Sequence, residues 1–272
     1  MKNILVATDL SARSDRAILR AIKLAKQYGA QLTILHVIDS DTLKSIAQEL
    51  KKVAEKEIQT CIATDIGDIK YNIEIISGCE YFDILTFIAQ KNFDLVVLGI
   101  HRHINQKLPF IGKTIERLIR HCNVPLLIAK ERAEDDYKDI MISVDFNIHS
   151  KQSIRFVLNY FKKSTFHLIH AFHVPFSAFV RDNVIEQQVF KQEQEKLAEF
   201  LSKEKLVNDD QIKKIIRKGD ISIILDEEIS TTKPNLLVLG THGRSGISHV
   251  IFNSLTEKLL INPPCDILAI KA

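Results

Sequence analysis

Short apolar runs alternate along the whole chain with longer stretches in which apolar residues recur at helical spacing. Each run is apolar at consecutive positions, so each is expected to be a strand buried on both faces, as in a parallel sheet covered by helices on both sides. There are five runs in each half of the chain: Ile4–Ala7, Leu32–Val37, Ile73–Ile76, Leu95–Leu98 and Leu126–Ala129, then Ile140–Val144, Phe166–Ala171, Ile212–Ile216, Leu236–Leu239 and Ile267–Ile270.

Helical patterns lie between these runs. Apolar residues at helical spacing follow Ser11 and Ser150, and both serines are expected to be N-caps. The charged segments Asp41–Ile58 and Arg181–Glu204 are expected to be partly exposed helices. Strands alternating with helices imply right-handed crossovers and an α/β fold with a doubly wound, five-stranded parallel sheet in each half. Such sheets bind ligands beyond the carboxyl ends of their strands.

The two halves of the chain are copies of one pattern. The segments Leu95–Leu118 and Leu236–Leu259 both read as apolar strand, glycine, polar loop and helix start, and Asn3–Ser11 recurs as Asp139–Asn147. A charged stretch without apolar periodicity, ERAEDDYK, separates the copies. A repeat of this size is a whole domain, larger than the unit of a solenoid or propeller. The sequence therefore predicts two tandem domains, at residues 1–132 and 138–272.

Composition narrows the class of protein. The net charge of +3 on 272 residues gives no reason to expect a nucleic-acid or membrane partner. The four cysteines are scattered without a C-x-x-C pair, which favours free thiols in a reducing compartment. The chain has no apolar run of membrane-spanning length and begins directly with a strand pattern rather than a signal peptide. A cytoplasmic protein is expected.

The second glycine-rich loop carries the main candidate chemistry. Gly240 and Gly243 follow a strand, and Asn253-Ser254 opens a helix after nine further residues. Glycines let backbone N–H groups approach an anion, and a helix start adds unpaired donors. Phosphate binding is one interpretation. The alternative is a structural turn, because Ser254 and Glu257 have the spacing of a capping box.

At this loop the chain resembles a tandem universal stress protein, whose ATP-binding members carry G-x2-G-x9-G-[ST] after the fourth strand and an aspartate after the first. The resemblance covers both halves and implies an adenine nucleotide alpha hydrolase-like, Rossmann-like fold in each. It also implies that the aspartate and the end of the second strand hold adenine and ribose, while the loop holds the phosphates. In the second half the matching residues are Asp145, Ala171, Gly240, Gly243, Asn253, Ser254 and Leu255. Asn253 stands in place of the last glycine.

The first half departs further from the pattern. Arg102 replaces the second glycine, and Lys113 replaces the serine. A bulky arginine opposes close backbone approach to a phosphate, although both side chains are suitable anion partners. The weaker site of this half comprises Asp9, Val37, Gly99, Arg102, Gly112, Lys113 and Thr114. ATP or another adenine nucleotide, with Mg²⁺ as a further candidate, is therefore expected mainly in the second half.

Metal and catalytic sites find little support in the sequence. His167, His170 and His173 recur every third residue, but strand alternation turns His170 away from the other two, and no metal site is expected. His36 and His170 are expected to be packed, hydrogen-bonded residues. There is no P-loop lysine motif and no G-x-S-x-G elbow. Weak ATP hydrolysis is the only enzymatic activity left open.

Two classes of function remain. The first is a nucleotide-binding regulatory module in the stress response, and the alternative is a nucleotide-free interaction scaffold whose loops have diverged. Single-domain relatives pair through their final strands, so the two halves are expected to form an intramolecular pseudo-twofold dimer through Leu126–Ala129 and Ile267–Ile270. A homo-oligomer is a further candidate.

Overall fold

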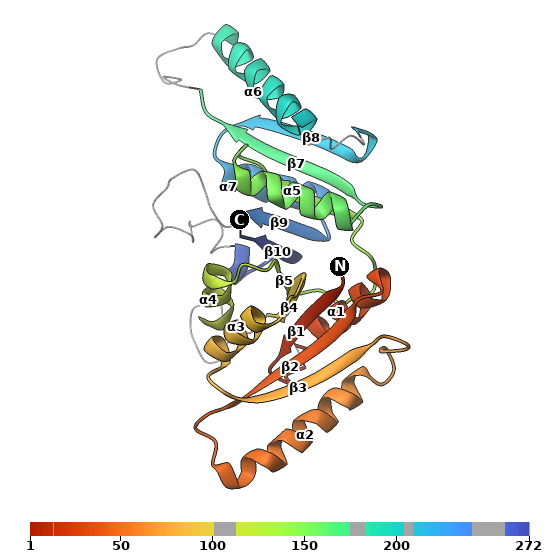
Figure 1. Cartoon of the computed structure of the whole chain (residues 1–272). Helices are drawn as coiled ribbons and strands as arrows, with labels where there is room; N and C mark the ends of the chain where they lie inside the picture. The colour runs from red at the N-terminus through yellow and green to blue at the C-terminus, as the bar shows by residue number, and fades with distance from the viewer. Residues whose placement is uncertain (13, 101–112, 175–182, 204–208, 241–258, 272) are drawn as a thin grey trace. The chain divides into compact units, whose positions relative to one another are not determined.

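The computed structural model describes the chain except for residues 13, 101–112, 175–182, 204–208, 241–258 and 272. The described residues fall into two units, the first comprising Met1–Asp136 with the C-terminal segment that carries the last strand, the second beginning at Tyr137. Both units are α/β, with strands and helices alternating along the chain (Figure 1).

The sheet of the first unit has the order β3-β2-β1-β4-β5-β10. Neighbouring strands from β1 to β5 are parallel. The chain moves outward from β1 to β3 and then returns to β4 on the other side of β1, so the strand order reverses at β1. The elements are β1 (Asn3–Thr8), α1 (Asp15–Tyr28), β2 (Gln31–Asp39), α2 (Lys44–Ile62), β3 (Tyr71–Gly78), α3 (Glu80–Gln90), β4 (Leu95–Gly99), α4 (Lys113–His121), β5 (Leu126–Ala129) and β10 (Asp266–Ile270).

The sheet of the second unit has the order β9-β6-β7-β8, and all of its neighbouring strands are parallel. β6 occupies the place that β1 has in the first unit, between the second strand of the repeat and the fourth. The elements are β6 (Asp139–Ser143), α5 (Ile148–Tyr160), β7 (Thr165–Phe172), α6 (Asn183–Lys203), the short 3₁₀ helix η1 (Asp209–Gln211), β8 (Ile212–Lys218), α7 (Ile221–Thr232) and β9 (Leu236–Gly240).

The predicted strands are confirmed as strands, with ends that differ from the predicted ones by at most two residues. Their apolar runs form the core: Ile4, Leu5 and Val6 of β1 are fully buried, and so are Leu236 and Leu237 of β9. Burial of consecutive residues places apolar side chains on both faces of each sheet, as the unbroken runs predicted. The α/β fold class is therefore confirmed.

The last strand pairs as predicted. β10 is antiparallel to β5, with Ile267 opposite Ile128 and Leu268 opposite Leu127. Because β10 packs within the first unit, the four parallel strands β6 to β9 make up the described sheet of the second unit. The last strand of the second copy thus contributes to the core of the first.

The predicted helix starts need two corrections. Asn147, not Ser150, caps α5, because its side chain accepts a hydrogen bond from the Ser150 N–H. The hydroxyl of Ser150 instead donates to Asp145. Ser14, not Ser11, precedes α1, and it makes no side-chain cap bond. In both halves the chain makes a tight turn at a residue with positive φ, Leu10 or Phe146, before the helix starts. The first helix therefore begins later than predicted, at Asp15, and the second begins earlier, at Ile148.

Candidate functional site

A cavity of about 670 Å³ opens beyond the carboxyl ends of β1, β2, β3 and β4 in the first unit. This is the edge at which the strand order reverses, where doubly wound sheets bind ligands. The wall has an apolar part, made by Leu35, Ile84, Leu98 and Ile115 among others, and a polar part. Its polar residues include Asp9, Ser11, Ser14, His36, Asp39, Ser40, Asp41, Cys79, Glu80 and Thr114.

The turn after β1 is fixed by hydrogen bonds. The Asp9 carboxylate accepts a 3.0 Å bond from the Ser11 N–H. The Thr8 and Ser14 hydroxyls lie 2.8 Å apart, and the His36 Nδ1 is 2.9 Å from the Thr8 carbonyl oxygen. Because a carbonyl only accepts, Nδ1 is the donor in that bond. The turn and the neighbouring strand β2 thus hold the aspartate at the cavity wall.

The cavity brings together four of the predicted first-half residues: Asp9, Val37, Gly99 and Thr114. The Thr114 hydroxyl donates to Glu80 at 2.9 Å, which ties the start of α4 to the start of α3. Lys113 is the first residue of α4. Arg102 and Gly112 lie outside the described residues.

The contribution of β3 and of the segment after β2 was not predicted from the sequence. Gly78, Cys79 and Glu80 follow β3, and Asp39 and Asp41 follow β2. A signal for them exists, because the carboxyl ends of parallel strands share one edge. The family pattern, however, directed the prediction to the ends of the first, second and fourth strands only. With the aspartate after β1, the wall carries four carboxylates, and none of its described residues is a lysine or arginine. Negative potential therefore dominates the described wall.

In the second unit the equivalent aspartate is bound to its own turn. One Asp145 carboxylate oxygen accepts from the Ser150 hydroxyl at 2.5 Å, and the other accepts from the Asn147 side-chain amide at 2.8 Å. Ala171 lies near the end of β7 and Gly240 ends β9. Gly243, Asn253, Ser254 and Leu255 lie outside the described residues, so the phosphate interpretation of that loop stays a prediction.

An aromatic cluster lies beside Asp145. Phe146 has φ 61°, and its ring lies 4.2 Å from the imidazole of His170 and 5.7 Å from Phe200 of α6, centroid to centroid. His170 is buried, with Nδ1 2.8 Å from the Val144 carbonyl and Nε2 3.2 Å from Glu193. The prediction that His170 is a packed, hydrogen-bonded residue is confirmed. His167 is also buried and bonds Asp139 at 3.0 Å.

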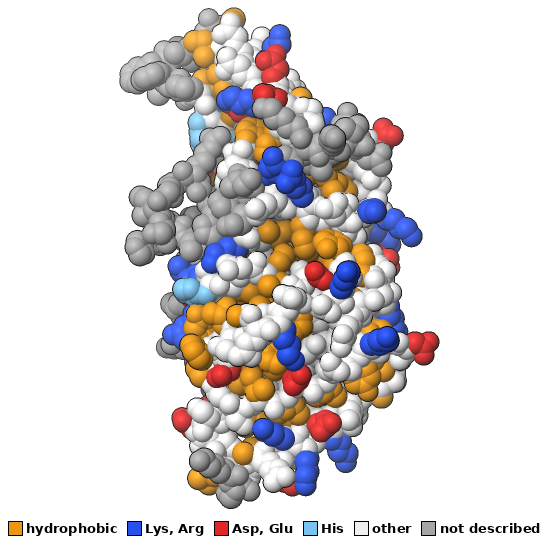
Figure 2. All heavy atoms as spheres, viewed as in Figure 1, with side chains coloured by type: hydrophobic (Ala, Val, Ile, Leu, Met, Phe, Trp, Pro, Cys, Tyr) orange, Lys and Arg blue, Asp and Glu red, His pale blue; other side chains and the backbone are white. Residues whose placement is uncertain are grey.

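The charged side chains on the face shown in Figure 2 are scattered and form no single continuous patch of one sign. Among the residues the structure describes, no three His, Cys, Asp or Glu side chains are grouped as metal ligands. In the same part of the chain, no helix combines the length and the apolar character needed to cross a bilayer.

The chain matches the sequence model of the universal stress protein family twice, at residues 1–130 and 136–271. The chain belongs to the universal stress protein family. It is a tandem member, with one copy of the family domain in each half.

Individual relatives agree with this assignment. A universal stress protein of Methanocaldococcus jannaschii is 27% identical over 146 residues, which cover 48% of this chain and 82% of that protein. A putative universal stress protein of Staphylococcus aureus is 30% identical over 141 residues, covering 47% of this chain and 84% of that protein. Among solved structures, a universal stress protein from Archaeoglobus fulgidus has a TM-score of 0.71 at 19% identity and covers 99% of this chain and 98% of its own. At that identity the likeness supports the tandem fold.

Proposed function

We propose that this tandem universal stress protein binds an adenine nucleotide or nucleoside and acts as a regulatory module in the stress response. The cavity of the first unit carries the proposal. Its wall contains Asp9, Val37 and Gly99, the positions that the family pattern assigns to ligand contact. Its volume of about 670 Å³ is in the range of small-molecule sites.

The wall suits the nucleoside part of such a ligand. The Asp9 carboxylate can accept hydrogen bonds from ribose hydroxyls, and Leu35, Val37 and Leu98 provide apolar contact for a base. These groups are fixed by the sheet and by the bonds of the β1 turn, so ligand binding requires little ordering of the wall.

The charge of the wall favours the nucleoside over a bare polyphosphate. A carboxylate and a phosphate charge about 5 Å apart repel by about 3 kcal/mol at an effective dielectric constant of about 20. Four carboxylates line the cavity, so a triphosphate needs compensation from Mg²⁺ or from the cations of the first-half loop, Arg102 and Lys113. We therefore assign nucleoside binding to the first half, and keep the second-half loop as the preferred triphosphate site.

Calorimetry with adenosine, AMP and ATP, each with and without Mg²⁺, tests the proposal. Mass spectrometry of the denatured protein identifies any nucleotide that co-purifies. Asp9→Ala should weaken adenosine binding at least fivefold, because it removes a charged acceptor. Asp68→Ala, an exposed carboxylate outside the cavity wall, should leave binding unchanged. Absence of binding by all three ligands, with no co-purified nucleotide, would refute the proposal.

The preference between the halves has its own pair of variants. Gly243→Arg should reduce ATP binding, because a side chain there blocks close backbone approach to phosphate. Arg102→Ala should change ATP binding little. Equal loss from both substitutions in calorimetry would contradict the preference for the second half.

A nucleotide-free interaction scaffold is the second candidate function. The observation in its favour is the bonding of Asp145 to Ser150 and Asn147, which already uses the carboxylate that the family pattern assigns to adenosine. Asn253→Gly and Ser254→Ala separate the candidates. If the loop binds phosphate, Asn253→Gly tightens ATP binding and Ser254→Ala weakens it. If the loop is only a helix start, Ser254→Ala lowers the melting temperature alone.

A further inference from the structure

The two units differ in how their outer strands are protected. β3 and β8 are the equivalent outer strands of the two sheets, and among the described strands each pairs on one side only, β3 with β2 and β8 with β7. An unpaired strand edge is a template for another strand, and lysine side chains are a common protection against such pairing. The outer edges of β3 and β8 therefore differ in their tendency to pair if their charged residues differ.

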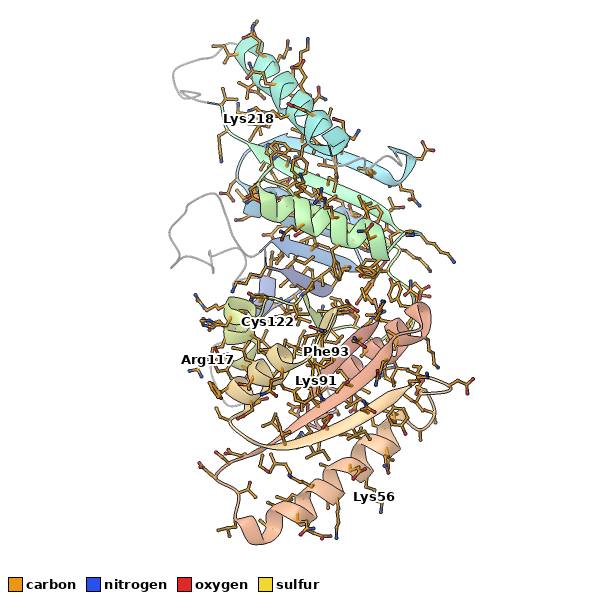
Figure 3. All side chains as sticks on the ribbon, viewed as in Figure 1. Lys56, Lys91, Phe93, Arg117, Cys122 and Lys218 are labelled. Carbon is orange, nitrogen blue, oxygen red and sulfur yellow. The ribbon has the colours of Figure 1, made fainter. Side chains whose placement is uncertain are left out.

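β8 carries the protection and β3 does not. β8 has the sequence IKKIIRK, with four cationic side chains in seven residues. β3 has the sequence YNIEIISG, whose single charged residue is Glu74. Glu74 is paired with Lys91 at 2.8 Å, and Lys91 is labelled in Figure 3. Two of the β8 cations are ion-paired, Arg217 with Glu227 and Glu228 and Lys218 with Glu186. A pair of β8 strands nevertheless brings together four cationic side chains from each copy, whereas a pair of β3 strands brings together one ion-paired glutamate from each.

The hydrogen bonds to β2 show which groups of β3 point outward. The carbonyl of Lys70 accepts from the Leu32 N–H, and that of Gly78 accepts from the Ser40 N–H. Backbone groups alternate between the two edges of a strand, so the even-numbered residues of β3 face β2. The N–H and C=O groups of Tyr71, Ile73, Ile75 and Ser77 face away from it.

We propose that the β3 edge is a homodimerisation surface, at which β3 pairs antiparallel with β3 of a second copy of this chain. With the twofold axis at Glu74, Ile73 of one copy lies opposite Ile75 of the other, and Tyr71 lies opposite Ser77 of the other. Every outward N–H and C=O of the strand then finds a partner, because directly opposed residues of this kind exchange two hydrogen bonds. The opposed isoleucines add apolar cross-strand contact.

The same axis places the two Glu74 carboxylates opposite each other, which is unfavourable unless they are compensated. Lys91 supplies that compensation from each copy, at 2.8 Å. The pairing therefore makes Lys91 a requirement for association even though Lys91 is not part of β3. Eight residues at about 3.3 Å each give an edge of about 26 Å. A contact of this size is at the small end of specific interfaces, so we expect weak association.

Sedimentation velocity of the full chain from about 1 to about 500 µM tests the surface. The wild type should shift from monomer to dimer across this range. Ser77→Pro removes one outward donor and keeps the bonds to β2, so it should raise the dissociation constant at least tenfold. Tyr71→Lys copies the protection of β8, and Lys91→Ala exposes the opposed glutamates. Each should raise the constant at least fivefold.

Gln59→Lys adds the same cation as Tyr71→Lys to an exposed position of α2 and is the matched control. It should leave the dissociation constant unchanged, and circular dichroism and urea titration of every variant confirm that the fold is intact. A wild type that stays monomeric throughout would overturn the proposal. A dimer that persists in folded Ser77→Pro and Tyr71→Lys would overturn it equally, because association then uses another surface.

Discussion

Replacing Asp266 should destabilise the first unit more than any exposed charge does. Asp266 begins β10, is fully buried, and accepts hydrogen bonds from the backbone N–H groups of Lys130 at 2.8 Å and Glu131 at 2.9 Å. Its second carboxylate oxygen lies 3.2 Å from the Nε of Arg20, whose side chain is 5% exposed. The remaining guanidinium nitrogens of Arg20 donate to the carbonyls of Asp135 and Arg132. This cluster holds the last strand of the chain against α1 and the segment after β5.

The magnitude follows from the burial. Removing one partner of a buried ion pair costs about 3–5 kcal/mol, because the other charge stays buried without compensation. The two N–H groups that lose their acceptor add to this cost, although such losses are not additive. We expect Asp266→Ala to lower the free energy of unfolding by about 4 kcal/mol. At an m value of about 3 kcal/mol/M, the urea midpoint of the first unit falls by about 1.3 M.

Urea titration followed by circular dichroism measures the effect, and Asp136→Ala is the matched control. Asp136 also pairs with a cation of α1, Lys23, at 3.4 Å, but its side chain is 60% exposed. Exposed pairs contribute about 0–1 kcal/mol, so the control should shift the midpoint by less than about 0.3 M. If the two variants shift the midpoint equally, the buried cluster does not hold β10 in place.

Further predictions concern local features of both units. Asp220 caps α7, and its hydrogen bond from the Ser222 N–H lowers the pKa of the Asp220 carboxyl below its usual value. Asp220→Ala should therefore lower the urea midpoint above about pH 4. The difference between variant and wild type should disappear as the pH falls through the lowered pKa. Gly29 follows α1 with φ 61°, and nothing lies within 4 Å of a Cβ added there. Gly29→Ala should lower the free energy of unfolding by about 1 kcal/mol through the strained backbone conformation alone, as measured by urea unfolding. Burial and the neighbouring Asp15 raise the pKa of the Cys61 thiol to about 11. At pH 8 iodoacetamide should therefore alkylate the exposed Cys79 at least tenfold faster than Cys61, with both rates measured by peptide mass spectrometry. Cys79 lines the cavity, and adenosine should slow its alkylation, whereas equal rates with and without saturating adenosine would contradict the proposed binding place.

The strands were predictable because burial on both faces leaves a direct mark on the sequence. Consecutive apolar residues in a short run, such as Ile4, Leu5 and Val6, are typical of a strand that is covered on both sides. The pairing of β10 with β5 came from the family resemblance and not from the apolar pattern, since a run of apolar residues does not specify its neighbour. The cluster of Arg20 and Asp266 left no local mark at all, because its members are far apart in the chain and each resembles a surface residue on its own.

The helix starts show a different limit. Ser150 and Asn147 are both good N-cap residues, and the sequence alone does not rank them. The structure decides through Phe146, whose positive φ ends the strand turn one residue before Asn147 and allows the Asn147 side chain to reach the Ser150 N–H. The Ser150 hydroxyl then donates to Asp145. The helix cap at Asn147 and the hydrogen bond to Asp145 therefore form one arrangement through Ser150. Residue spacing in the sequence indicates a cap and a ligand residue separately and does not reveal this link.

The two copies of the domain differ around equivalent histidines. His36 and His170 each lie with Nδ1 within 2.9 Å of a backbone carbonyl at or just after the end of the neighbouring strand. In the second unit, Glu193 of α6 binds the other ring nitrogen of His170, and Phe146 covers the ring. The two helices can be aligned by their buried apolar pairs, Leu197 and Leu201 in α6 and Ile58 and Ile62 in α2. In this alignment Ala54 of α2 takes the position of Glu193 in α6.

The surroundings of the two histidines differ in the same way. Glu193 lies 3.2 Å from the imidazole of His170, whereas His36 lies in the wall of the 670 Å³ cavity. At the turn, Leu10 stands where the second unit has Phe146, so no aromatic ring of the turn covers His36. One duplicated framework therefore supports a cavity at this place in the first unit and, in the second, a buried histidine that lies against Glu193.

The small side chain at Ala54 can be tested as the cause of this difference. Ala54→Glu gives the first unit a carboxylate at the position of Glu193. If this carboxylate reaches His36 as Glu193 reaches His170, it lies at the cavity wall and should reduce adenosine binding in calorimetry. Ile58→Val changes a buried residue one turn further along α2 and should leave adenosine binding unchanged. If folded Ala54→Glu binds adenosine as tightly as the wild type, the size of this side chain does not keep the cavity accessible, and the divergence of the two histidine sites lies in the turn after the first strand of each copy instead.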